Sequence, residues 1–302
     1  MLISKAHLSA IIAFSMWGLF PIYWKFFKEV SPWDLFGHRL LWSFVTLMLI
    51  LLYRKKLKEL GLIWHDPKKR ILLICSAILI SSNWLLYIYA VNTGRILEAS
   101  MGYFLNPLIN VFMGWIILKE KIRSTQWPSI ILATIAILMM LFQSHLNDFP
   151  WIAITLSLTF AMYGLLRKVT QVGSLEGLSF ETCVVIIPTL IIWFFQPTTP
   201  LTVLTEISPM KFAVLTLSGI VTCLPLVLFA FSARQLTLQT MGFIQYLSPS
   251  FKFLCGLFIF NEPLATSKLQ AFVLIWIALV WYTIESYYFT RKVRAKDIPL
   301  SE

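Results

Sequence analysis

Long apolar segments, separated by short polar ones, run along the whole chain. A helix needs about 20 apolar residues to cross the hydrocarbon core of a bilayer, because it rises about 1.5 Å per residue. The sequence therefore predicts ten membrane-spanning helices, over residues 7–27, 33–53, 71–92, 98–118, 127–143, 150–168, 178–195, 210–231, 238–260 and 268–290. The connections are too short for a soluble domain. We expect an all-α polytopic membrane protein with a single transmembrane domain over residues 1–302.

The composition excludes an ordinary soluble protein. Of the 302 residues, 58% are hydrophobic and 13% are charged, and the mean hydropathy is +0.78. Such values are typical of chains that face lipid. The net charge of +11 raises the possibility of nucleic-acid binding. However, the Lys and Arg residues lie in short blocks between apolar segments, so we expect a lipid bilayer as the partner and no nucleic acid.

The distribution of positive charge predicts the orientation in the membrane. Residues 54–70 contain seven Lys and Arg residues, and further ones lie in 119–123 and 291–296. The loops 144–150 and 196–209 contain none. Loops on the cytoplasmic side carry an excess of Lys and Arg. The pattern therefore predicts a multi-pass protein of the bacterial inner (cytoplasmic) membrane with both termini in the cytoplasm.

One sequence motif occurs twice. Gly102 and Pro107 in the first half correspond to Gly242 and Pro249 in the second. Proline lacks a backbone donor, so these residues predict two helix breaks, which are tolerated at membrane depth only inside protein or beside a wet cavity. The alternative is a packing kink. Each motif is followed by a glutamate, Glu120 or Glu262, which we interpret as a boundary or capping residue.

The repeat extends to the first helix, whose Phe14, Trp17 and Gly18 match Phe160, Tyr163 and Gly164. We therefore divide the chain into two five-helix repeats, residues 1–143 and 144–302. Because five is odd, the second repeat must cross the membrane in the opposite sense to the first, as in several transporter classes.

Four sequence blocks resemble the drug/metabolite transporter superfamily, and within it the EamA branch. The blocks are residues 38–44, 83–92, 97–108 and 163–168. The closest resemblance is to a permease group described as chloramphenicol-sensitive, and it covers nearly the whole chain. It implies an inner-membrane permease with a central cavity between the two halves. Lys252 departs from the pattern of that group, in which an apolar residue is usual at this position.

Aromatic and polar residues around the prolines and on neighbouring helices are the candidate substrate contacts, because they combine stacking surfaces with hydrogen-bonding groups. These residues are Trp17, Asn83, Trp84, Tyr87, Tyr103, Phe104, Asn106, Tyr163, Gln245, Tyr246 and Ser248. The alternative for the aromatic residues is contact with lipid.

Ionisable side chains inside apolar helices are costly, at least about 2.5 kcal/mol near the bilayer centre, so their positions are informative. The candidates for charge recognition or ion coupling are His38, Arg39, Glu98, Glu181 and Lys252. Arg39 binds either an anionic or carbonyl group of the substrate or Glu98. Glu181 either takes up a coupling proton, as His38 also can, or pairs with Arg234 or lipid headgroups. For Lys252 we favour snorkelling or pairing.

These features predict a secondary-active permease that moves small polar or amphiphilic metabolites by alternating access, with drugs such as chloramphenicol among the candidate substrates. Proton coupling and exchange are both open. A dedicated amino-acid or cofactor importer is the alternative within transport, and a membrane enzyme or non-transport membrane protein is the alternative outside it. No catalytic or metal-binding motif is evident, so we expect no enzyme activity and no metal or other cofactor. Gly114 and Gly256 suit either internal packing or a homodimer contact.

Overall fold

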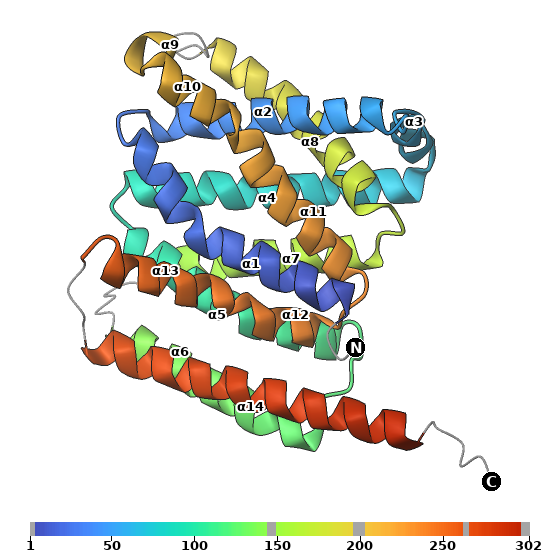
Figure 1. Ribbon diagram of the computed structural model, residues 1–302, viewed down its shortest axis with the longest axis vertical. Coiled ribbons are helices and arrows are strands. Elements are labelled where there is room, and N and C mark those ends of the chain that lie inside the picture. Colours follow the sequence, from blue (N-terminus) through green and yellow to red (C-terminus); the bar gives the residue numbers. More distant parts are fainter. Residues whose placement is uncertain (1–3, 144–148, 196–202, 262–265, 297–302) are drawn as a thin grey trace.

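The protein is a bundle of helices. The computed structural model describes residues 4–143, 149–195, 203–261 and 266–296, which contain helices and turns and no strand. In Figure 1 most helices run side by side across the view, with α9, α10 and one end of α8 at one edge and α6 and α14 at the other. The elements are α1 (Lys5–Trp24), η1 (Lys25–Phe27), α2 (Pro32–Tyr53), α3 (Lys58–His65), α4 (Pro67–Asn92), α5 (Ile96–Ile116), η2 (Ser124–Gln126), α6 (Trp127–Gln143), α7 (Trp151–Val169), α8 (Ser174–Phe194), α9 (Val203–Glu206), α10 (Pro209–Thr216), α11 (Ser218–Ala233), α12 (Leu238–Gln245), α13 (Leu247–Phe258) and α14 (Thr266–Lys296).

Eight helical stretches in the described part of the chain are long and apolar enough to cross a membrane. They are Lys5–Phe27, Pro32–Tyr53, Pro67–Ala90, Ser124–Phe142, Trp151–Val169, Ser174–Trp193, Pro209–Ala233 and Leu269–Phe289. Each coincides with one of the predicted spans. The other two predicted spans, 98–118 and 238–260, coincide with α5 and with the successive helices α12 and α13. Apolar side chains such as Ile187 and Ile191 of α8 are exposed, as a lipid-facing surface requires.

Local sequence signals begin several of these helices. Ser31 accepts a hydrogen bond from the backbone N–H of Asp34 at the start of α2, and proline occupies the first helical position. Ser208 and Pro209 repeat this arrangement at the start of α10. A short polar side chain satisfies a free backbone donor there, and the proline has no donor to leave unpaired.

Two of the predicted spans are interrupted. The span 210–231 consists of α10 and α11, and the span 238–260 consists of α12 and α13. At each junction one backbone N–H bonds three residues back: Leu217 to Val214 at 3.1 Å, and Tyr246 to Phe243 at 3.2 Å. A single tighter turn therefore separates the two parts.

The basic segment 54–70, which the sequence analysis treats as a loop, contains the short helix α3. Ile63 of α3 is buried against Leu73, whereas Leu62 and Trp64 are exposed. An amphipathic pattern of this kind forms a helix because one face has a packing partner.

The first of the two predicted helix breaks is wrong. α5 continues from Ile96 to Ile116 through Pro107, with α7 and α12 packed against it. The proline removes only one hydrogen bond, to the carbonyl of Tyr103, and the neighbouring helices hold the direction of the chain. Pro249 does lie beside a break, at Tyr246. It occupies the first turn of α13, where a backbone N–H has no partner within the helix.

The two copies of the repeated motif cross each other. A Cβ atom added to Gly242 would lie 2.5 Å from the carbonyl oxygen of Pro107, so only glycine allows α12 to approach α5 this closely. On α1, a Cβ atom added to Gly18 would lie 2.9 Å from the carbonyl oxygen of Ser248. These contacts bring α1, α5, α12 and α13 together at the centre of the bundle.

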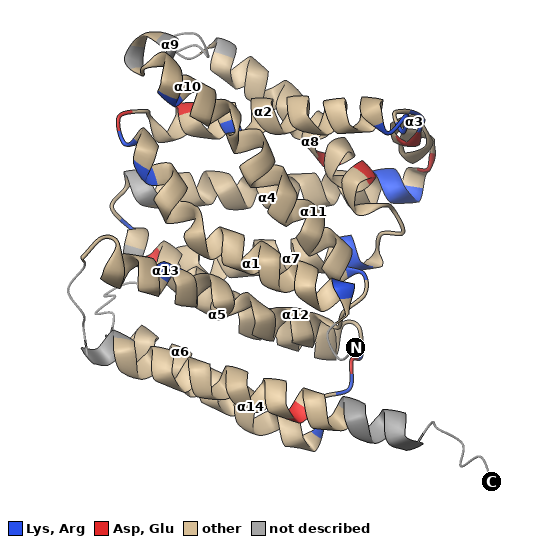
Figure 2. Cartoon of the chain, in the orientation of Figure 1, with Lys and Arg blue, Asp and Glu red and all other residues tan. Residues whose placement is uncertain are grey.

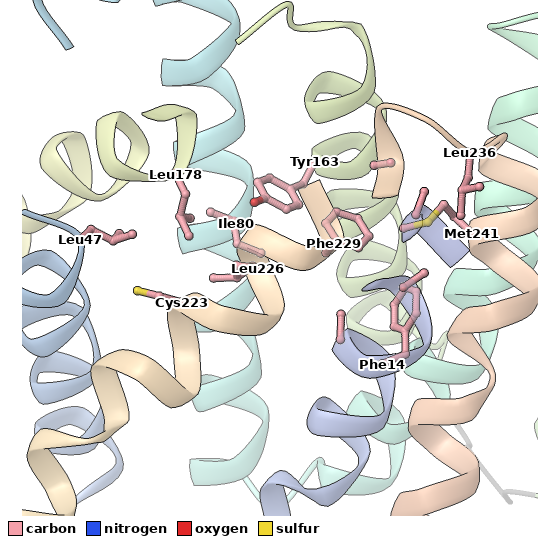
Figure 3. Packing of buried hydrophobic residues seen from close by; sticks show 14 residues of the cluster. Phe14, Leu47, Ile80, Tyr163, Leu178, Cys223, Leu226, Phe229, Leu236 and Met241 are labelled. Atoms are coloured by element: carbon pink, nitrogen blue, oxygen red, sulfur yellow. The ribbon is translucent and has the colours of Figure 1, made fainter. Parts of the chain in front are cut away.

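Aromatic packing closes one end of this centre. Phe229 of α11 stacks on Tyr163 of α7, with ring centroids 5.8 Å apart, and also contacts Phe14, Trp17 and Phe160 at 5.4–5.9 Å. Figure 3 shows the rings of Tyr163 and Phe229 lying beside each other within the buried cluster. Most Lys, Arg, Asp and Glu residues lie towards the ends of the helices, whereas their middle parts are largely uncharged (Figure 2).

The contacts of Glu120 confirm the capping role that the sequence suggests for this residue. Its carboxylate accepts the backbone N–H groups of Leu238 and Gln239 at 3.0 and 3.3 Å, at the start of α12. A carboxylate at a helix N-terminus stabilises the free donors and the helix dipole. Lys168, near the end of α7, lies 3.6 Å from the same carboxylate. Glu262 lies outside the described residues.

Candidate functional site

A cavity with a volume of about 280 Å³ lies among eight helices, α1, α2, α4 and α5 from the first half and α7, α11, α12 and α13 from the second. It extends from Phe14 to Trp24, the last residue of α1, and meets the aromatic cluster around Phe229 at one end. The lining residues are Phe14, Trp17, Phe20, Pro21, Trp24, Arg39, Asn83, Trp84, Tyr87, Ile88, Gly102, Tyr103, Asn106, Leu156, Phe160, Thr222, Leu226, Gln245, Ser248, Pro249 and Lys252. Cavities that bind small molecules commonly combine such apolar walls with a few polar groups.

The cavity brings together most of the candidate residues from the sequence analysis. Those that line it are Trp17, Asn83, Trp84, Tyr87, Tyr103, Asn106, Gln245 and Ser248, together with Gly102, Pro249, Arg39 and Lys252. They come from helices that are far apart in sequence.

Three of the predicted substrate contacts point elsewhere. Phe104 is buried against Phe272 of α14, with ring centroids 5.2 Å apart. Tyr163 is fully buried and stacks on Phe229. Tyr246 packs with Phe243, and among the described residues its hydroxyl has no hydrogen-bond partner. Neighbours in a helical sequence face different sides, so adjacency to a cavity residue does not bring a side chain into the cavity.

Arg39 reaches the cavity from α2 and does not pair with Glu98. Its guanidinium lies 5.2 Å from the ring centre of Trp24 and 5.0 Å from that of Trp84. Its Nε donates to the hydroxyl of Thr222 at 3.4 Å. Arginine stacks well on aromatic faces, which hold its planar group in place. Among the described residues, no carboxylate forms an ion pair with Arg39.

Glu98 is used structurally instead. It pairs with Arg95 at 2.6 Å and accepts the backbone N–H of Ile152 at 2.7 Å. It therefore stabilises the start of α7, and the predicted Arg39–Glu98 pair is wrong.

Lys252 faces the cavity, so the preferred expectation of snorkelling or pairing is wrong. Its Nζ lies 3.7 Å from the ring centre of Tyr103. In the part of the chain that the structure describes, Lys252 forms no hydrogen bond or ion pair. The Lys252 side chain points from α13 into the cavity, where the face of the Tyr103 ring attracts its positive charge.

Glu181 lies in a buried polar cluster rather than beside Arg234 or lipid headgroups. Its Oε1 lies 3.2 Å from Nη1 of Arg167, and the hydroxyl of Ser76 donates to the same oxygen. The hydroxyl of Tyr163 lies 3.5 Å from Oε2. Arg234 donates to the carbonyl of Val172 instead.

The Glu181 carboxylate lines a second cavity of about 20 Å³. This cavity shares Trp84, Thr222 and Leu226 with the larger one. His38 lines neither cavity and is buried between the rings of Trp193 and Phe212.

A network of amides forms part of the cavity wall. Nδ2 of Asn110 donates to Oε1 of Gln245 at 2.7 Å and to Oδ1 of Asn106 at 3.2 Å. Asn83 donates to the carbonyl of Leu156 and the hydroxyl of Thr159 at 2.7 and 2.8 Å. These hydrogen bonds fix the orientation of all four amides, because each has at least one atom in a hydrogen bond.

Sequence reasoning missed Trp24, Phe160, Thr222 and Asn110. A signal existed for two of them. Phe160 is the repeat counterpart of Phe14, and Trp24 follows Pro21, a proline inside α1 like those inside the repeated motif. Thr222 and Asn110 lie within apolar segments, and nothing in their local sequence separates them from other buried polar residues.

Comparisons with known proteins place this chain among membrane transporters. A model of the EamA-like transporter family matches residues 4–142. The protein RarD of Escherichia coli (strain K12) is 36% identical over 286 residues, which are 94% of this chain and 96% of that protein. An uncharacterized transporter of Pseudomonas aeruginosa is 36% identical over 290 residues, 96% of each chain. A solved crystal structure has a TM-score of 0.73 and covers 94% of this chain and 99% of its own, at 14% identity, so it supports the fold alone.

Proposed function

The chain belongs to the EamA-like transporter family, and we propose that it is a secondary-active permease of the bacterial inner membrane that moves small polar or amphiphilic molecules by alternating access. The observation that carries the proposal is the central cavity, because helices from both halves of the chain line it. Sites of this kind at the interface of two repeats are typical of secondary transporters.

The packing of the helices supports the inverted repeat. In the repeat, α1 corresponds to α7, and α5 corresponds to the pair α12 and α13. α5 of the first repeat packs against α7 of the second, and α12 and α13 of the second repeat pack against α1 of the first. α4 packs against α7 just as α11 packs against α1. α5 contacts α12, and α6 contacts α14, so these pairs join a helix with its own counterpart. A two-fold pseudo-axis in the membrane plane would produce this exchange of neighbours. On this proposal α5 and the pair α12–α13 are the two remaining spans of a ten-helix bundle.

The closed end of the cavity supports alternating access. Phe229 and the rings around it separate the cavity from the ends of α7 and α11, where Lys168 and Arg234 lie. Glu120 adds a second connection there between α7 and α12. If the Lys- and Arg-rich loops are cytoplasmic, this arrangement is closed towards the cytoplasm, and these contacts must separate for the opposite state to form.

Proton coupling through Glu181 is part of the proposal. The second cavity has room for a single water, and it links Glu181 with Thr222, which also contacts Arg39. His38 is a weaker candidate because it lines neither cavity. We expect transport by a Glu181→Gln variant to lose the pH dependence of the wild type. An unchanged pH profile would remove Glu181 from the coupling mechanism.

The test of the permease function combines binding with flux. Purified protein is screened for thermal stabilisation by amino acids, nucleotides, sugars and amphenicol drugs, since a ligand that binds the folded state raises its apparent stability. Each stabilising compound is then followed in exchange across proteoliposomes, with gradients in both directions to separate import from export. We expect Asn106→Ala to lose exchange and Thr283→Ala, an exposed position outside the cavity, to retain it. A compound that binds in the cavity but is never exchanged would refute the proposal.

A further inference from the structure

The cavity contains two cations and no counter-charge of its own. Arg39 and Lys252 both line it, and no Asp or Glu is among the described residues of its wall. Two other cations of the described bundle pair with buried acids: Arg95 with Glu98 and Arg167 with Glu181. Within the described residues, the interactions of the charged groups of Arg39 and Lys252 are with aromatic rings, together with one hydrogen bond from Arg39 to Thr222. An ionised group at membrane depth is costly unless a partner or water compensates it.

Two amide side chains of the wall, Asn106 and Gln245, keep their NH₂ groups available as hydrogen-bond donors, whereas Asn83 uses its NH₂ group and leaves its carbonyl oxygen. The side-chain carbonyl oxygens of Asn106 and Gln245 both accept hydrogen bonds from the NH₂ group of Asn110. Their amide N–H groups are therefore directed to other partners, and among the described residues none accepts from them. Two NH₂ groups, a guanidinium and an ammonium thus share one cavity. Such a set is complementary to acceptors that carry negative charge.

Most of the remaining wall is apolar or aromatic, apart from Asn83 and the hydroxyl groups of Tyr87, Tyr103, Thr222 and Ser248. Phe14, Trp17, Phe160 and Leu226 lie towards the closed end, away from Trp24 at the end of α1. The volume of about 280 Å³ is just below the usual range for ligand cavities, which is roughly 300–1,000 Å³. The site is therefore suited to a small molecule with one apolar part and one polar end.

We propose that the permease site selects organic anions, in which a carboxylate binds Arg39 and Lys252 and a compact apolar or aromatic body lies against Trp17 and Phe160. This inference rests on the proposed transport function and names the substrate class of the same site. A carboxylate supplies the counter-charge that the wall lacks and accepts hydrogen bonds from the free donors. A cationic or zwitterionic ligand would place its ammonium near two fixed positive charges, with no acid in the described wall to receive it.

Three probes with the same body and different end groups test the proposal: phenylacetate, phenylacetamide and phenethylamine. Indole-3-acetate and 4-hydroxyphenylacetate extend the carboxylate series. Binding is measured on the purified full-length protein by ligand-induced thermal stabilisation. We expect the carboxylates to stabilise the wild type in a saturable manner, and the amide and the amine to have little effect.

Matched variants locate the carboxylate. We expect Arg39→Gln and Lys252→Met each to weaken phenylacetate binding by about tenfold or more, as for the loss of a charge-assisted hydrogen bond. Arg39→Lys should restore part of the affinity because it keeps the charge. Lys211 lies outside the cavity and pairs with Glu29. Lys211→Met therefore removes a positive charge away from the site, and this variant should bind phenylacetate like the wild type. If Arg39→Gln does not fold, Arg39→Lys and Lys252→Met decide the question.

Several results would overturn the inference: equal stabilisation by phenylacetate and phenylacetamide, preference for the amine, no stabilisation by any of the carboxylates, or wild-type affinity in both charge-neutralised variants. Exchange in proteoliposomes separates this failure from failure of the transport proposal. Exchange of a neutral drug without binding of carboxylates would refute the anion selectivity and retain the permease. Binding of phenylacetate without exchange of any compound would retain the anion selectivity of the site and refute the permease function.

Discussion

The buried pair of Arg167 and Glu181 allows a quantitative prediction. The two side chains are 1% and 2% exposed, and Nη1 and Oε1 lie 3.2 Å apart. At an effective dielectric constant of about 20, this separation corresponds to an attraction of about 5 kcal/mol, against which the desolvation of both groups must be set. Removing one partner leaves the other charge buried without compensation, at a cost of about 3–5 kcal/mol. We therefore expect Glu181→Leu to lower the free energy of unfolding by about this amount.

The double variant separates the pair from the packing around it. In Arg167→Met/Glu181→Leu neither charge of this pair remains, and apolar side chains of similar size fill the space. We expect most of the lost stability to return, because replacing both members of a buried pair is often close to neutral. The exposed pair of Asp66 and Lys69 provides the control: its side chains are 36% and 41% exposed, so Asp66→Asn should cost less than about 1 kcal/mol.

The measurement is equilibrium unfolding of the purified proteins in mixed detergent micelles, followed by intrinsic tryptophan fluorescence. The reasoning requires a large loss in Glu181→Leu and a clear recovery in the double variant. It is refuted if Glu181→Leu is as stable as the wild type, or if the double variant is no more stable than the single one. The second result would assign the effect to packing and not to the uncompensated charge.

Three further substitutions test the packing of the central helices. Gly242→Ala should destabilise the protein by about 1–3 kcal/mol, because the new Cβ would lie 2.5 Å from the carbonyl oxygen of Pro107. Gly61→Ala, with no atom within 4 Å of the new Cβ, is its control, and equal melting temperatures of the two variants would contradict the close crossing. Tyr246→Phe should leave stability and ligand affinity unchanged or slightly improved, because the buried hydroxyl has no partner among the described residues; a clear loss of either would reveal a role for that hydroxyl. Glu120→Gln should lower the melting temperature by the equivalent of about 1–2 kcal/mol, because it removes the charge that caps α12, and an unchanged melting temperature would show that this cap contributes little.

Apolar segment length was sufficient to predict most of the helices. Eight stretches of the described chain satisfy the criteria for crossing a membrane at predicted positions, because a helix that faces lipid must be apolar over its whole length. The interruptions at Leu217 and Tyr246 could not be predicted in the same way. Each interruption is a single tight turn inside an apolar segment, and it leaves no mark on the composition of that segment.

The repeated glycine and proline motif correctly indicated where the central cavity lies, but the reason differs from the one that the sequence suggested. Pro107 does not break α5; the motif matters because Gly242 allows two helices to cross at that proline. The position of a close contact depends on the partner helix, and Gly242 lies 135 residues after Pro107 in the chain. The residues around Pro107 therefore do not indicate which helix packs against them.

The fate of each charged side chain was decided by tertiary structure. The sequence by itself determined that Arg39, Glu98, Glu181 and Lys252 lie within or beside apolar helices, since their positions in the segments are fixed. It did not determine their partners. Glu98 and Glu181 pair with Arg95 and Arg167. Arg39 and Lys252 face the cavity, and their partners among the described residues are aromatic rings and one hydroxyl group. Side chains on separate helices compete for the same partners, and only the packing of those helices decides which charges are neutralised and which remain available to a ligand.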